Sequence, residues 1–216
     1  MNLPVTDKTS DEFRPIATRC VALLVVILDV VQIRFPLGIE SSVLGLSGLV
    51  AVLCLNNGQA DSLGLRLAPT QGWWYWCRLA AFFGFWIGLA LFVYVGVWLS
   101  LGKALPVIRT YPSIHALTWM CVQAPVTEEV IYRVLLLVAV LPTLGHRGSI
   151  VTSGVIFALI HVLRGNASPE NQIAGFMLAW AYLKSGTILV PIAMHSGGNL
   201  IALGGQVAGW YFTSDV

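Results

Sequence analysis

The stretch SIHALTWMCVQAPVTEEVIYRVLLLVAVL, residues 113–141, is an almost unbroken apolar run with three charged side chains near its centre. A helix of about 20 mostly apolar residues is long enough to cross a bilayer. Charged groups at that depth cost about 2.5–3.5 kcal/mol each on insertion scales, so they are kept where they have a partner or a function. This stretch therefore predicts a membrane-spanning helix with a functional site near its middle.

The whole chain shares this apolar character. Hydrophobic residues make up 57% of its 216 residues, and charged residues make up 10%. A soluble domain carries about 25% charged residues, so this composition excludes a soluble globular protein. It also excludes a disordered chain, which needs low hydrophobicity. The net charge of +2 offers no basic field for nucleic acid. The four cysteines lie singly, so we expect no disulfide framework. The composition predicts an all-α, polytopic membrane helix bundle.

Seven apolar segments are candidates for membrane-spanning helices. The number becomes eight if the last segment breaks at Gly204-Gly205. The expected helices cover residues 16–35, 37–55, 74–101, 113–141, 149–163, 169–184 and 187–212.

The distribution of basic residues predicts an orientation in the membrane. Cytoplasmic loops of membrane proteins are enriched in Lys and Arg. With a cytoplasmic N-terminus, seven basic residues lie inside and four outside, which favours this orientation. The compact size and short loops suggest a prokaryotic plasma membrane. The inside group is Lys8, Arg14, Arg19, Arg66, Arg78, Arg147 and Lys184, and the outside group is Arg34, Lys103, Arg109 and Arg164.

The charges of the 113–141 segment divide into a pair and a single acid. Glu129 and Arg133 are four residues apart, so they share a helix face and can form an ion pair. Glu128 points about 100° away from Glu129 on the helix and needs a partner from elsewhere. Asp29, at the end of the first apolar run, is predicted to pair with a neighbouring helix or to snorkel toward the membrane surface.

The helix rise estimates how deep the polar groups of three segments lie. At 1.5 Å per residue, Glu128 lies about 20 Å from one membrane face, and His161 and Asn199 lie about 18 Å from the same face. His195 lies about 12 Å from it. We therefore expect Glu128, His161 and Asn199 in one layer, with His195 one turn away.

Three sequence motifs together resemble those of a known family. They are Glu128-Glu129-x-x-x-Arg133, Phe157-x-x-x-His161 and His195-x-x-x-Asn199. In this order, each in an apolar helix, they resemble the CPBP intramembrane proteases. This family, also called the Abi family, includes CaaX prenyl proteases and bacteriocin-processing proteins. The resemblance implies endoproteolysis within the membrane. It divides the chain into a cytoplasmic leader (1–15), accessory helices (16–112) and a catalytic helix core (113–212).

The resemblance also implies roles for the polar residues. Glu128 would activate a water molecule, and His161 would hold or polarise that water. His195 and Asn199 would position the water or stabilise the oxyanion. Glu129 and Arg133 would support the helix face. The chemistry is consistent, since amide hydrolysis needs a base and donors aimed at the developing oxyanion. The implied substrate is a membrane-embedded or lipid-modified protein or peptide.

Two cofactor hypotheses stay open. Glu128, His161 and His195 could hold one zinc ion with a fourth position left for water. The same residues could work without metal, as a glutamate protease. The HExxH motif of common zinc proteases is absent, and the sequence slightly favours the metal-free hypothesis.

Other functional classes have weaker support in the sequence. Gly45-Leu-Ser47-Gly48 resembles the GxSG motif of rhomboid serine proteases, but the HxxxN motif follows this serine instead of preceding it. Ser47 is therefore expected to be a packing residue. The non-enzyme alternative is a catalytically inactive scaffold or a transporter-like protein. Transporters often contain internal repeats, and none is visible here.

Overall fold

The computed structural model describes residues 16–103 and 113–213, and the predicted leader and Arg109 lie outside these residues. The described residues are 82% helix and contain no strand, which confirms the all-α prediction. The helices are α1 (Ile16–Gln32), α2 (Ser41–Leu55), η2 (Ala60–Leu63), α3 (Trp73–Ser100), α4 (Ile114–Thr118), η3 (Trp119–Gln123), α5 (Ala124–Glu129), η4 (Val130–Leu135), α6 (Leu136–Leu163), α7 (Pro169–Ser185) and α8 (Leu189–Thr213).

Helix α4, the π-helical turns η3 and η4, helix α5 and the first part of α6 form one continuous rod. Turn η3 ends two residues before Pro125, whose missing N–H cannot donate to the carbonyl one turn back. The rod ends at Gly145, where φ is 62°, a backbone conformation that favours glycine. The second part of α6 then packs back on η4, because Ser153 Oγ donates to the Tyr132 carbonyl at 2.8 Å. The predicted turn between the 113–141 and 149–163 segments is therefore confirmed.

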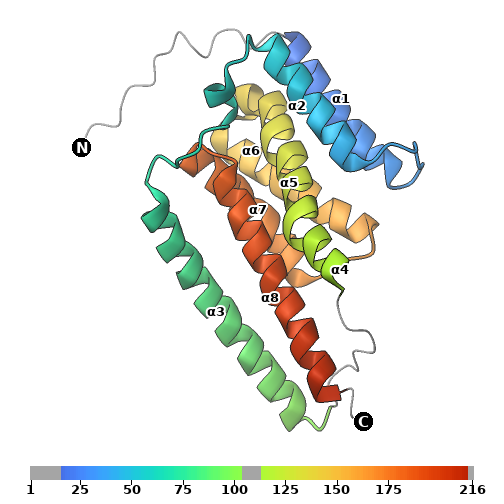
Figure 1. The fold of residues 1–216 in the computed structure, drawn as a ribbon, viewed down its shortest axis with the longest axis vertical. Coiled ribbons are helices and arrows are strands. Elements are labelled where there is room, and N and C mark those ends of the chain that lie inside the picture. The colour runs from blue at the N-terminus through green and yellow to red at the C-terminus, as the bar shows by residue number, and fades with distance from the viewer. Residues whose placement is uncertain (1–15, 104–112, 214–216) are drawn as a thin grey trace.

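The rod is the centre of the bundle. In Figure 1 it lies between the α1–α2 pair and the α7–α8 pair. Nearly every side chain from Val130 to Val138 is buried. These residues pack against Ala22 and Val25 of α1 and Val52 of α2. A helix that is apolar on all sides is buried, as the composition of this segment predicts.

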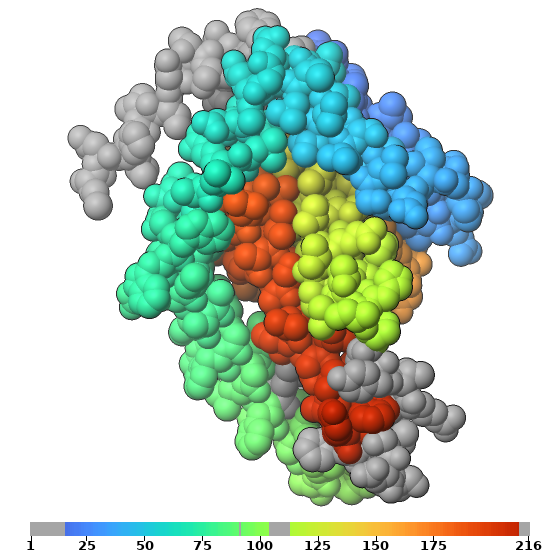
Figure 2. All heavy atoms as spheres, viewed as in Figure 1, coloured from blue at the N-terminus to red at the C-terminus, as the bar shows by residue number. Residues whose placement is uncertain are grey.

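Helix α3 lies at the edge of the bundle, alongside α8 (Figure 1). Figure 2 shows it as a separate arm over much of its length. Its inner end is anchored by Trp76, which is buried and stacks edge-on against Trp180 at 5.7 Å. Most other side chains of α3 are apolar and exposed. This surface is suited to contact with lipid.

Two helical stretches of the described residues are long and apolar enough to cross a membrane. They are Trp73–Ser100 and Ile114–Leu163, the second of which folds back at Gly145. These helices indicate an integral membrane protein. The predicted segments fall largely within helical residues, but 113–141 extends from α4 to the first part of α6 and 149–163 is the second part of α6. Helix α8 continues unbroken through Gly204 and Gly205. The last segment therefore supplies no eighth helix, while the number of membrane crossings stays a prediction.

Helices α6 and α7 approach closely at two glycines. A Cβ atom on Gly175 would lie 3.0 Å from the Gly154 carbonyl oxygen and 2.9 Å from Phe157 Cβ. The backbone atom cannot move aside, so we expect Gly175→Ala to destabilise the protein by about 1–3 kcal/mol. Thermal unfolding in detergent measures this. Gly88→Ala on α3 is the control, because nothing lies within 4 Å of its Cβ. Equal midpoints for both variants would contradict close packing of α6 on α7.

Candidate active site

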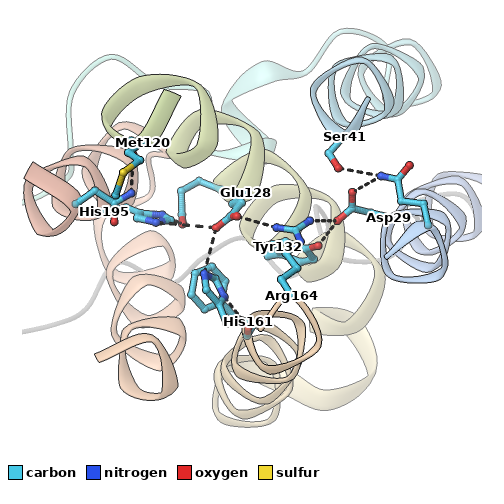
Figure 3. Close-up of polar contacts among 12 residues, drawn as sticks. Asp29, Ser41, Met120, Glu128, Tyr132, His161, Arg164 and His195 are labelled. Carbon is cyan, nitrogen blue, oxygen red and sulfur yellow. Dashed lines mark hydrogen bonds and ion pairs between the residues drawn. The ribbon is translucent and has the colours of Figure 1, made fainter. Parts of the chain in front are cut away.

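Glu128 faces two histidines that belong to different helices (Figure 3). Its Oε2 atom lies 4.0 Å from His161 Nε2 of α6 and 3.9 Å from His195 Nε2 of α8. All three side chains are largely buried, each with about a tenth of its surface exposed. The structure thus brings together three of the four predicted catalytic residues around one carboxylate oxygen.

The second nitrogen of each histidine ring is held by an acceptor. His161 Nδ1 lies 3.0 Å from the Phe157 carbonyl oxygen, which can only accept a hydrogen bond. His195 Nδ1 lies 2.9 Å from Glu129 Oε1, another acceptor. Both Nδ1 atoms therefore carry the proton, and both Nε2 atoms face Glu128. Such a partner fixes the tautomer and the ring orientation of a functional histidine.

The predicted ion pair between Glu129 and Arg133 is confirmed. Arg133 Nε lies 2.9 Å from Glu129 Oε2, and both side chains are fully buried. The guanidinium also lies over the Phe157 ring, 4.6 Å from its centre. Glu129 therefore has two partners, since its other oxygen holds His195. The sequence predicted the first contact from helical spacing and could not predict the second.

Asn199 lies apart from the Glu128 contacts. Its Nδ2 atom donates to the Met120 carbonyl oxygen of η3 at 2.6 Å. The predicted layer is wrong in its order, because His195 faces Glu128 directly while Asn199 reaches the turn two helical turns before it. The predicted depths assume that all helices start at one level, which the contact of Asn199 with Met120 contradicts.

Glu128 also has a positively charged partner that sequence analysis did not identify. Arg164 Nη1 lies 2.9 Å from Glu128 Oε1, and Arg164 Nη2 lies 3.5 Å from Asp29 Oδ2. Asp29 is fully buried and also accepts from the Tyr132 hydroxyl. The prediction that Asp29 pairs with a neighbouring helix is confirmed. The signal for Arg164 was its position three residues after His161, on the same side of the helix.

A cleft of about 560 Å³ opens beside Glu128. Glu128, His161 and Arg164 line it together with the polar side chains of Ser41, Ser42 and Asn166. These polar side chains give water a path to a site inside an apolar bundle.

The GxSG segment of α2 packs differently from the prediction. Its glycines make the close contacts, since a Cβ on Gly45 would lie 2.9 Å from Ile131 and one on Gly48 would lie 2.7 Å from Val25. Ser47 itself is exposed on the other side of the helix. The prediction that Ser47 is a packing residue is therefore wrong.

The residues predicted for a zinc site fit the metal in chemistry but not in spacing. One carboxylate and two neutral imidazoles form a donor set that zinc accepts. Among the described residues, however, no three His, Cys, Asp or Glu side chains are arranged to hold a metal ion. Arg164 already places a positive charge on the other oxygen of Glu128, which opposes a second cation there.

Comparison with known proteins relates this site to a protein family. Residues 110–201 match the family model described as type II CAAX prenyl endopeptidase Rce1-like. No curated protein and no solved structure matches the chain. The match to this model implies a peptidase. The matched segment contains all six predicted site residues, and the match to the Rce1-like type II CAAX prenyl endopeptidase model agrees with the predicted resemblance to the CPBP proteases.

Proposed function

We propose that this protein is an intramembrane endopeptidase in which Glu128 activates the water that attacks a peptide bond. One observation carries the proposal. Glu128 Oε2 lies 4.0 and 3.9 Å from the Nε2 atoms of His161 and His195. Both distances are too long for direct hydrogen bonds, yet one oxygen atom between the groups can lie within hydrogen-bonding distance of all of them.

The chemistry follows from the protons that each group holds. Glu128 Oε2 takes a proton from water, and the water oxygen attacks the carbonyl carbon of the scissile bond. His161 Nε2, with its proton on Nδ1, accepts a hydrogen bond from the second O–H of the water and so orients it, and that hydrogen stays on the attacking oxygen. When the carbon–nitrogen bond breaks, the protonated Glu128 returns its proton to the leaving amine. Each proton is thus taken up and released by a named group.

His195 and Asn199 are the groups proposed to stabilise the oxyanion. Glu129 accepts from His195 Nδ1, and a carboxylate in this position stabilises an imidazolium, which donates at Nε2. The Asn199 amide has two N–H groups, and its contact with Met120 uses one of them. A donor aimed at a developing oxyanion contributes about 10²–10³-fold to a rate.

We propose that this reaction needs no metal, because Arg164 supplies the positive charge at Glu128. If zinc were bound, Glu128, His161 and His195 would hold it, and it would supply a more acidic water. Purified protein should therefore keep its activity with a zinc chelator and contain no stoichiometric metal. Metal analysis of wild type and His161→Ala checks this. One zinc ion per chain in wild type, lost in the variant, would contradict the metal-free proposal.

We propose that the substrate is a membrane-embedded or lipid-modified peptide, and that the protein crosses a prokaryotic plasma membrane seven times with its N-terminus in the cytoplasm. The family description, with its prenylated CAAX substrate, supports a lipid-modified peptide. The test compares cleavage of a prenylated CAAX peptide and its unprenylated counterpart by the protein in vesicles. Mass spectrometry of membrane peptides, from cells with the wild type and with Glu128→Gln, searches for other substrates. Identical peptides in both samples would support the alternative, an inactive scaffold or transporter-like protein.

A further inference from the structure

Arg164 joins two carboxylates that come from distant parts of the chain. Its side chain extends from the end of α6 between Glu128 of α5 and Asp29 of α1 (Figure 3). The distances are 2.9 Å to Glu128 Oε1 and 3.5 Å to Asp29 Oδ2. A third of the Arg164 side chain is exposed, and it lines the cleft. Arg164 can therefore be reached from the solution while it touches the proposed base.

Asp29 is held rigidly on the other side of this arginine. It is fully buried and accepts from the Tyr132 hydroxyl and from Gln32 Nε2, the latter at 2.8 Å. Gln32 in turn donates to Ser41 Oγ at 2.9 Å. Several hydrogen-bond donors from different helices hold a buried carboxylate in a single orientation. Helix α1 lies outside the segment that matches the family model, so Asp29 links the accessory helices to the site.

The pair with Arg164 determines how the two oxygens of Glu128 are used. Arg164 occupies Oε1, which leaves Oε2 turned toward both histidine Nε2 atoms. The last torsion of a glutamate side chain is broad, so a carboxylate without this partner would rotate more freely. A reacting group that is displaced by about 1 Å can lose about 10²-fold in rate.

We propose that Arg164 is a positioning residue that orients Glu128 for catalysis, and that Asp29 fixes Arg164 in place. This proposal rests on the proposed role of Glu128 as the base. A different role, in which Arg164 binds an anionic part of the substrate, is disfavoured by charge. Among the described residues, three acids line the cleft (Asp29, Glu40 and Glu128), while Arg164 is its one arginine or lysine.

Chemical rescue tests the positioning role of Arg164. We expect Arg164→Ala to lower kcat about 10²-fold with little change in KM, because orientation and not substrate binding is lost. Methylguanidinium should restore part of kcat by entering the cleft, and sodium chloride at the same concentration should not. Arg66→Ala is the matched control, because Arg66 is an exposed arginine that pairs loosely with Asp61 at 4.0 Å. It should keep full activity and show no rescue.

A double-mutant cycle tests the role of Asp29. Asp29→Asn should lower kcat about tenfold, and combining it with Arg164→Ala should cause no further loss, because residues acting through one group are not additive. If Arg164→Ala does not accumulate as folded protein, Arg164→Lys decides the question, with a partly reduced kcat expected and a normal kcat contradicting the proposal.

Several results would overturn this inference. They are a normal kcat in Arg164→Ala, a loss confined to KM, no rescue by methylguanidinium, or fully additive losses in the cycle. Failure of the proposed function is distinguishable, since it appears as normal cleavage by Glu128→Gln. If Glu128→Gln is inactive while Arg164→Ala cleaves at the normal rate, the positioning role alone is wrong.

Discussion

Glu128→Gln should lower the cleavage rate about 10²–10⁴-fold while the protein stays folded in the membrane. The amide has the shape of the carboxylate but cannot accept a proton from water. Its oxygen can still accept from Arg164, so the contacts that surround residue 128 are retained. Initial rates of peptide cleavage in vesicles measure the effect. Thermal unfolding in detergent verifies that the variant is folded.

Glu40→Gln is the matched control for this experiment. Glu40 is an exposed acid that lines the same cleft, and its side chain contacts Ser42 instead of a histidine. It should cleave at the wild-type rate. Normal cleavage by Glu128→Gln would refute the assignment of Glu128 as the base and favour the inactive scaffold.

Arg133→Met should have the largest effect on stability. Arg133 and Glu129 are fully buried and 2.9 Å apart, at the centre of the rod. Removing one partner of a buried pair leaves an uncompensated charge and costs about 3–5 kcal/mol. The free carboxylate would also hold His195 less precisely, because Glu129 joins the two residues. The midpoint of denaturant unfolding in detergent measures the loss.

The double variant Glu129→Gln/Arg133→Met separates charge from packing. It removes both charges, so it should recover part of the stability that Arg133→Met loses. Its catalytic rate should stay low, because His195 has lost its carboxylate partner. An Arg133→Met variant as stable as wild type would show that the ion pair does not stabilise the rod.

Much of this site was predictable from the sequence because it depends on local spacing. The contact of Glu129 with Arg133 follows from four residues on one helix face. The separation of Glu128 from Glu129 follows from the angle between successive residues. Because a charged side chain inside a membrane costs free energy, the positions of such side chains indicate the site. Glu128, His161 and His195 do lie together. These predictions need no knowledge of how the helices are tilted or offset.

The contacts between helices were not predictable in the same way. Depth in the membrane, estimated from the helix ends, predicts Asn199 at the level of Glu128. In the structure, Asn199 lies beside Met120 instead. The two π-helical turns, η3 and η4, change the rise of the rod and so the level at which its side chains meet those of other helices. The distribution of basic residues predicts Arg164 outside the membrane, whereas its long side chain reaches back to Glu128.

The sequence by itself determined that this chain is an apolar helical protein whose scarce internal charges gather on one helix. That conclusion depends on the amino-acid composition and on the spacing of residues along a helix, and both can be read directly from the sequence. Only the tertiary structure decided which oxygen of Glu128 faces the histidines and which is held by Arg164. Asp29 and Arg164 are 135 residues apart in the chain, so their contact exists only once α1 packs against α6.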